Sequence, residues 1–216
     1  MECSTRQGGG VRRNRELDRN SRRGRSESPR LLIFTEDKYA GRSYFLGLKN
    51  QLRARGIDLG AEHGEPLNLV RSAVAKRDLA KRDPHTRYDE VWCVIDVEAP
   101  VPHPSLEDAL TLARQQRVSV AIANPCFELW LYQHFEQVNG YRTSKHMAKA
   151  LEELGRCNGY CVGHKDIQYS DFAPLVPKAV EHATALHSCV EANRHTNPWT
   201  DIHLLVQRIR AEHGCG

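Results

Sequence analysis

Apolar residues along the chain fall into two patterns, short runs rich in β-prone side chains and longer stretches with helical spacing. The short runs predict strands at about 30–36, 57–63, 90–96 and 118–122. The longer stretches predict helices at about 41–55, 67–82, 105–116, 124–135, 141–155, 172–193 and 200–212. Strands that alternate with helices predict an α/β fold: a mainly parallel central sheet flanked by helices on both faces, with a helical C-terminal part from about 140 to 216.

Capping and breaking residues set the expected bounds of two helices and one loop. Ser105 is the expected N-cap of its helix, with Asp108 three residues later as an imperfect capping box. Asn124 is the expected N-cap of the next helix, where Pro125 suits the first turn. The stretch 156–171 contains glycines and mixed polar residues, so it is predicted to be a loop.

Length and composition are those of one soluble domain. The chain has 216 residues, 40% of them hydrophobic, which is enough for a single core. No apolar run approaches the ~20 residues that cross a bilayer, and the arginine-rich start contains no hydrophobic signal segment. The seven cysteines are an odd, scattered set, which indicates reduced thiols rather than a disulfide framework. These features predict a cytoplasmic protein that does not enter a membrane.

The basic charge of the chain is concentrated at its N-terminus. Residues 1–30 contain nine arginines and four acids, a net charge of +5, whereas the remaining residues sum to −1. Because residues 1–29 also have almost no apolar content, they are predicted to form a disordered basic tail before a single domain over 30–216. Such a tail either binds nucleic-acid phosphates without sequence preference or is a solubilising extension with no specific task.

Carboxylates directly follow two of the predicted strands. Glu36 ends the first apolar run, and Asp96 and Glu98 end the run that begins near residue 90. The carboxyl ends of parallel strands meet at one edge of a sheet, where ligands bind. Two adjacent carboxylates repel by roughly 1 kcal/mol in water and about 4 kcal/mol near a protein surface, and a divalent cation relieves that repulsion. The pattern therefore predicts a Mg²⁺ site; the alternative is that acids simply cap strands and begin loops.

Other charged side chains extend this candidate site. Asp96 and Glu98 are two residues apart, so they point the same way if the backbone stays extended. Glu128 lies in the first turn of a helix that leaves the third central strand, where it adds a ligand or orients a metal-bound water, or only complements the helix dipole. Lys165 follows the core sheet in a polar context, where it stabilises charge on a phosphorane-like transition state or is simply solvated.

Other cysteines, histidines and sequence motifs are also relevant to the chemistry of the chain. Cys157, Cys161 and the nearby His164 suggest zinc, but the usual second pair of ligands is missing, so ordinary loop cysteines are the favoured interpretation. His134 and His203 lie on apolar helices and are expected to be hydrogen-bonded core or edge residues. The sequence contains neither a GxxxxGK[ST] phosphate loop nor a GxSxG element, which excludes a P-loop ATPase and gives no support to a serine hydrolase.

A set of motifs spread over the chain matches one known family. The motifs are Thr35-Glu36-Asp37 followed by Tyr44-Phe45, Tyr88 to Trp92 running into Ile95-Asp96, Asn124-Pro125-Cys126-Phe127-Glu128-Leu129-Trp130 with His134, and Asn197-Pro198-Trp199-Thr200 with His203. Together they resemble RloB-like proteins over most of residues 30–212. The Asn-Pro-x-Phe-Glu-Leu-Trp element is the most specific of them.

This resemblance implies a Toprim-like domain, a Rossmann-like α/β fold shared with topoisomerases, primases and OLD-family nucleases. In that group a glutamate after the first strand and an Asp-x-Asp pair after a later strand carry magnesium-dependent phosphodiester chemistry. By position, Glu36 takes the first role, and Asp96 and Glu98 take the second. The chain departs from the pattern at Asp37, where glycine is commoner, and at Glu98, which replaces an aspartate.

RloB-like proteins are associated with bacterial restriction or phage-defence loci, often beside an ATPase. The leading hypothesis is therefore a Mg²⁺-dependent nuclease of phage defence, with Mn²⁺ as a substitute ion and DNA or RNA as substrate. Glu36, Asp96 and Glu98 would hold the metal, Glu128 would support it, and Lys165 would neutralise developing charge. The alternatives are a non-catalytic nucleic-acid-binding or sensing subunit of an ATPase-containing defence complex, and nucleotidyl transfer. An oligomer is compatible with each of these hypotheses.

Overall fold

The computed structural model describes residues 28–188 and 193–213. Nearly all of the predicted disordered tail, residues 1–27, lies outside the described residues, as does the end of the helix expected to reach 193. The described chain folds around a five-stranded sheet in the order β2-β1-β3-β4-β7. The strands are β1 (Leu31–Thr35), β2 (Ile57–Leu59), β3 (Glu90–Asp96), β4 (Ser119–Asn124) and β7 (Trp199–Thr200).

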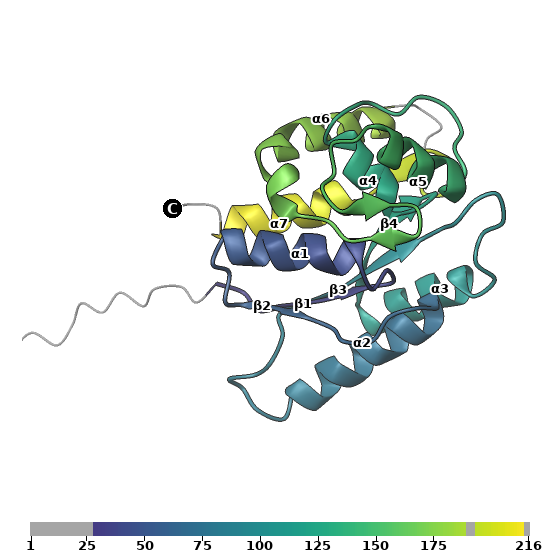
Figure 1. The fold of residues 1–216 in the computed structure, drawn as a ribbon. Coiled ribbons are helices and arrows are strands. Elements are labelled where there is room, and N and C mark those ends of the chain that lie inside the picture. The colour runs from purple at the N-terminus through teal and green to yellow at the C-terminus, as the bar shows by residue number, and fades with distance from the viewer. Residues whose placement is uncertain (1–27, 189–192, 214–216) are drawn as a thin grey trace, which may run out of the picture.

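The first four strands of this sheet run parallel, and β7 pairs antiparallel with β4 at the edge. The helices are α1 (Ala40–Gln51), α2 (Pro66–Ala80), α3 (Leu106–Gln116), α4 (Phe127–Gln133), α5 (Ser144–Glu153), α6 (Val176–His187) and α7 (Ile202–His213). In Figure 1 the sheet is seen nearly edge-on, with α2 and α3 below it and the other helices above it. The predicted α/β fold, with a mainly parallel sheet and a helical C-terminal part, is confirmed.

The sheet separates two hydrophobic cores, and β1 contributes to both. Leu31 and Ile33 point into the core shared with α1, α4, α6 and α7, whereas Leu32 and Phe34 point into the core shared with α2 and α3. All four side chains are fully or almost fully buried, as expected for a parallel strand covered on both faces. Burial of each such side chain is worth about 1.5–3 kcal/mol, so the strand that carries Glu36 at its end is firmly anchored.

An aromatic cluster fixes α1 against α4 and the chain near residue 170. The Tyr44 ring centroid lies 6.1 Å from that of Trp130, 5.6 Å from that of His134 and 5.0 Å from that of Tyr169. The Tyr44 hydroxyl also lies 3.1 Å from Nε2 of His134, whose Nδ1 donates to the Trp130 carbonyl at 2.9 Å. Burial lowers the pKa of His134 to about 4, so this ring is neutral, as expected for a hydrogen-bonded core histidine.

The predicted N-cap at Asn124 is wrong. Asn124 is the last residue of β4, paired with Trp199 of β7, and the N-cap position of α4 is Cys126. The strand runs to Asn124 because β7 covers its edge, so α4 begins only after Pro125. Ser105 does occupy the N-cap position of α3, but its side chain makes no capping bond and instead lies 3.1 Å from Nδ1 of His103.

The loop predicted over 156–171 contains regular structure. A two-stranded antiparallel hairpin, β5 (Tyr160–Cys161) and β6 (His164–Lys165), precedes two 3₁₀ turns, η1 (Tyr169–Asp171) and η2 (Ala173–Leu175). The hairpin strands have two residues each, too few for an alternating pattern to reveal them. Of the helices in the described parts of the chain, none is long and apolar enough to cross a membrane.

Candidate functional site

Glu36 and Asp96 meet at the carboxyl edge of the sheet. β1 and β3 are neighbours in parallel register, with Thr35 opposite Val94, and the backbone N–H of Glu36 donates to the Val94 carbonyl at 3.0 Å. Beyond this bond, Oε2 of Glu36 accepts a hydrogen bond from the backbone N–H of Asp96 at 3.0 Å. The two strand ends therefore lie side by side, as the sequence pattern predicts.

Both carboxyl groups of this pair are harder to ionise than usual. Burial raises the pKa of Glu36 to about 7, and the charges of Glu98 and Asp37 contribute smaller increases. The backbone N–H of Asp96 acts in the opposite direction, because its hydrogen bond stabilises the carboxylate. Burial also raises the pKa of Asp96 well above its ordinary value, and the charges of Glu36 and Glu128 add to that effect. The ionised form of this pair is therefore disfavoured in the free protein, and a bound cation would stabilise it.

A third carboxylate, Glu128, lies at the same edge and is already paired with a cation. It stands in the first turn of α4, and its side chain is only 2% exposed. Its Oε1 lies 2.7 Å from Nζ of Lys165 on β6 and accepts a hydrogen bond at 3.2 Å from the hydroxyl of Tyr160 on β5. The hairpin therefore brings a cation and a hydroxyl onto a buried acid 32–37 residues earlier in the chain.

The Lys165 ammonium reverses the effect of burial on Glu128. Burial alone would raise the pKa of this carboxyl, but the charge and hydrogen bond of Lys165 outweigh it and hold the pKa below its usual range. Burial likewise disfavours the charged ammonium of Lys165, but Glu128 outweighs it and raises the pKa of the lysine. Both groups stay ionised at neutral pH, so Lys165 is not the simply solvated lysine of the alternative interpretation.

The Glu36–Asp96 pair and the Glu128–Lys165 pair belong to one electrostatic site. The charge of Glu128 raises the pKa of Asp96, whereas the charge of Lys165 lowers it. Asp96 and Asp37 in turn favour the charged form of Lys165. The structure thus brings four of the five predicted site residues together: Glu36, Asp96, Glu128 and Lys165.

Glu98 does not follow the predicted geometry. Its φ of 65° places it in the left-handed region, so the extended backbone that would align it with Asp96 is absent. The residue is exposed, and its backbone N–H donates to the Pro125 carbonyl at 2.8 Å. Its side chain lines a different cavity, of about 390 Å³, with His103 and Leu106. Its charge still contributes to the raised pKa of Glu36.

The residues that fit a metal ion best are the pair Glu36 and Asp96. Within residues 28–188 and 193–213, no group of three or more His, Cys, Asp or Glu side chains is arranged to hold a metal ion. The expected three-carboxylate set of Glu36, Asp96 and Glu98 is therefore not assembled. Mg²⁺ in phosphoryl chemistry usually needs only one or two carboxylates, with waters and substrate phosphates as the remaining ligands. Glu36 and Asp96 lie close together and fit that smaller requirement.

The zinc interpretation gains no support from the described residues. Cys157 is buried, Cys161 is exposed, and Nε2 of His164 lies 2.9 Å from a carboxylate oxygen of Asp166. His203 is likewise a buried residue, with Nδ1 donating to the Thr200 carbonyl at 3.1 Å. Burial lowers its pKa to about 4, in keeping with the expected core or edge role.

Two contributors to the site were not predicted from the sequence. Asp37 caps α1, since its carboxylate accepts hydrogen bonds from the backbone N–H groups of Gly41 at 2.7 Å and Tyr39 at 3.3 Å. An acid shortly before a helical pattern is the signal that could have revealed this cap. Tyr160, which donates to Glu128, has no such signal because it lies in a glycine-containing stretch without an evident pattern.

Comparison with known proteins gives one match. No curated protein and no solved structure matches this chain. The model of one family, described as RloB-like protein, matches residues 31–209, which include β1, β3, α4 and the hairpin that together carry the site. The match covers far more than half of the 216 residues, and the chain therefore belongs to the RloB-like family.

Proposed function

We propose that this protein is a Mg²⁺-dependent nuclease that hydrolyses phosphodiester bonds of nucleic acid. The observation that carries the proposal is the pair of adjacent, largely buried carboxyl groups, Glu36 and Asp96, whose pKa values are raised although Lys165 acts on Asp96. Such a pair is a ready site for a hard divalent cation. The charged Glu128–Lys165 pair beside it supplies a fixed positive group.

Each residue of the site has a defined part in this proposal. Glu36 and Asp96 would hold the ion, which when bound supplies a Lewis acid and an activated water. Glu128 positions Lys165 through the 2.7 Å ion pair, and the Tyr160 hydroxyl orients the Glu128 carboxylate. The Lys165 side chain is 35% exposed, so its ammonium is accessible to phosphoryl oxygens, where it stabilises the negative charge that develops during hydrolysis.

The cellular role follows from the family resemblance and is part of the proposal. RloB-like proteins are associated with phage-defence loci and often with an ATPase, so we infer that the nuclease acts in such a system with an ATPase partner. The cytoplasm is the corresponding location. A nucleolytic assay with and without an ATPase from a locus of this kind tests this part.

Cleavage assays on plasmid, single-stranded DNA and tRNA with Mg²⁺ test the chemistry. Glu36→Gln and Asp96→Asn are expected to lower the rate by about 100-fold or more, the order of effect seen when a transition-state contact is removed. Asp78→Asn is the matched control, because it also neutralises one carboxylate but lies exposed on α2, in a surface ion pair with Lys81. Wild-type rates in both site variants would overturn the proposal.

One observation favours a second candidate, a non-catalytic binding or sensing subunit. Glu98 leaves the strand with a left-handed backbone, and among the described residues no group of three or more His, Cys, Asp or Glu side chains is arranged to hold a metal ion. Titration calorimetry with Mg²⁺ separates the two candidates. Mg²⁺ binding to the wild-type chain that is lost in Glu36→Gln supports the nuclease, whereas no binding and no cleavage in the presence of the ATPase supports the subunit.

A further inference from the structure

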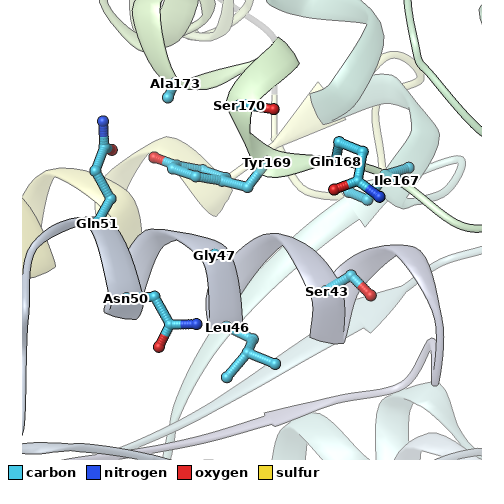
Figure 2. A pocket seen from close by; sticks show the side chains of 10 residues that line it. All are labelled: Ser43, Leu46, Gly47, Asn50, Gln51, Ile167, Gln168, Tyr169, Ser170 and Ala173. Atoms are coloured by element: carbon cyan, nitrogen blue, oxygen red, sulfur yellow. The ribbon is translucent and has the colours of Figure 1, made fainter.

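Two cavities lie along the same seam of the molecule. One wall of the seam is the segment 37–51, which contains α1, and the other is the segment 162–173, which contains β6 and η1. The first cavity, of about 440 Å³, is lined by Asp37 and Tyr39 on one side and by residues 162–165 on the other. The second, of about 490 Å³, lies further along α1, as Figure 2 shows.

The first cavity adjoins the candidate site. Asp37 directly follows Glu36, and its charge raises the pKa of that carboxyl. On the opposite wall, Lys165 lines the cavity and pairs with Glu128 at 2.7 Å. A ligand in this cavity therefore lies beside the groups that the proposed function uses.

An exposed aromatic ring forms one side of the first cavity. The Tyr39 side chain is 53% exposed, although it stands at the N-cap position of α1, where the Asp37 carboxylate fixes its backbone. Nζ of Lys38 lies 5.7 Å from the centre of its ring. An accessible ring with ammonium groups nearby is the arrangement on which proteins stack the bases of single-stranded nucleic acid, while the cations contact phosphates.

The second cavity has a different chemistry, because its lining residues carry no charge. Side-chain amides of Asn50, Gln51 and Gln168 line it, and Figure 2 shows the Tyr169 ring lying over α1. Tyr169 approaches so closely that a Cβ at Gly47 would lie 2.1 Å from the tyrosine Cβ. Neutral amide donors and acceptors suit the edges of bases rather than phosphate groups.

The length of the seam matches a short strand of nucleic acid. Residues 39–51 span about 18 Å at the 1.5 Å helical rise, the length of roughly five stacked nucleotides. The bases of a duplex are paired and stacked on each other, so they are not available to a tyrosine ring or to amide groups in a narrow seam. A single strand exposes both the faces and the edges of its bases.

We propose that this seam, between residues 37–51 and 162–173, binds a single-stranded segment of the substrate. Tyr39 stacks on the base next to the phosphate at the Glu36–Asp96 pair, and the amide-lined cavity receives bases further along the strand. This inference rests on the proposed function for its cleavage step and names the substrate class of that site. Tyr39 is accordingly a positioning residue.

Fluorescence anisotropy with labelled single strands and duplexes of one sequence, as DNA and as RNA, tests the proposal in EDTA, where binding is measured without cleavage. The wild-type chain is expected to bind the single strand more tightly than the duplex. Tyr39→Ala is expected to weaken single-strand binding by roughly 5- to 100-fold, the effect of losing one stacked base. Tyr39→Phe keeps the ring and is expected to bind like wild type.

Tyr141→Ala is the matched control, because Tyr141 is similarly exposed, at 56%, but lies in the loop between α4 and α5. Its binding is expected to be unchanged. In cleavage assays Tyr39→Ala is expected to raise KM more than it lowers kcat. Unchanged single-strand binding by Tyr39→Ala, or equal binding of duplex by wild type, would overturn the inference.

The two proposals fail in different ways. If Glu36→Gln cuts like wild type while Tyr39→Ala loses single-strand binding, the nuclease proposal is wrong and the binding seam stands. If Glu36→Gln abolishes cleavage while Tyr39→Ala binds normally, the nuclease proposal stands and the binding seam is wrong.

Discussion

The candidate site contains two acidic regions that differ in one respect. Glu36 and Asp96 lie together, and their pKa values are raised, although the charge of Lys165 acts on Asp96 in the opposite direction. Glu128 is more deeply buried, yet its pKa is lowered because Lys165 lies 2.7 Å away. Burial alone therefore does not set the charge of this edge of the sheet. The second pair contains a cation bonded to its carboxylate, whereas at the first pair the charge of Lys165 on Asp96 only partly offsets burial.

Removing the internal cation is expected to have the largest effect on stability. Lys165→Met leaves Glu128 buried without its ion-pair partner. The free energy of unfolding is expected to fall by about 3 kcal/mol, the low end of the effect of breaking a buried ion pair, because the Lys165 side chain is 35% exposed. Urea denaturation at pH 7 measures this loss. Lys149→Met, which breaks an exposed pair with Glu153, is the control and is expected to change stability by under about 1 kcal/mol. Equal losses in the two variants would remove the distinction between the regions.

Adding the external cation is expected to stabilise only the first pair. Mg²⁺ at about 100 times its dissociation constant is expected to raise the free energy of unfolding by about 2.7 kcal/mol. Thermal denaturation with and without Mg²⁺ measures the shift. It is expected in the wild type and to disappear in Glu36→Gln. A shift that persists in Glu36→Gln would place the ion elsewhere.

The raised pKa of Glu36 has a pH signature of its own. The pKa of this carboxyl rises from 4.5 to about 7 on folding. Its contribution to the free energy of unfolding is therefore fully present below pH 4.5 and is lost as the pH rises through about 7. The full shift corresponds to about 3 kcal/mol, and the partial exposure of Glu36 to solvent reduces it, so without Mg²⁺ Glu36→Gln is expected to be more stable than wild type by about 2 kcal/mol at pH 8. The difference should fall to about zero by pH 4.5. Parallel urea titrations at the two pH values check this, and a pH-independent difference would contradict it.

The smallest effect is expected at the Tyr160 hydroxyl. Tyr160→Phe removes its hydrogen bond to Glu128 but leaves the Lys165 ion pair, so a loss of about 1 kcal/mol is expected. Urea denaturation of this variant beside Lys165→Met ranks the two partners of Glu128. A loss as large as that of Lys165→Met would mean that the hydroxyl, rather than the ammonium, is the main partner.

The parts of the site that lie on strands could be predicted, and the parts that depend on loops could not. Glu36 and Asp96 follow apolar runs, and parallel pairing of these runs is enough to bring the two residues together. The contact of Glu128 with Lys165 depends on a hairpin with two-residue strands, which has no periodic signature. Glu98 adopts a left-handed backbone conformation, which the pattern of apolar and polar residues does not predict for a glutamate.

The fold shows the same division. Three of the four parallel strands are distinct apolar runs and were predicted for that reason, whereas the strand expected over 57–63 is only Ile57–Leu59 and contains a polar residue. The strand β7 was missed because it has only two residues, Trp199 and Thr200. This strand forms because the edge of β4 at Ala123 and Asn124 offers it a partner. The misplaced cap at Asn124 has the same cause, since the length of β4 is decided by a segment about 75 residues away.

That late strand bears on how the protein is made. Asn124 leaves the ribosome about 75 residues before its partner Trp199, a delay of roughly 4–15 s at 5–20 residues per second. During that interval the nascent chain already contains Glu36, Asp96 and Glu128, while the edge of its sheet stays open and Lys165 emerges only part-way through. We expect the edge of β4 to stay open until Trp199 has emerged, so that a chain at this stage of translation carries its acidic groups on a sheet that still lacks one edge strand.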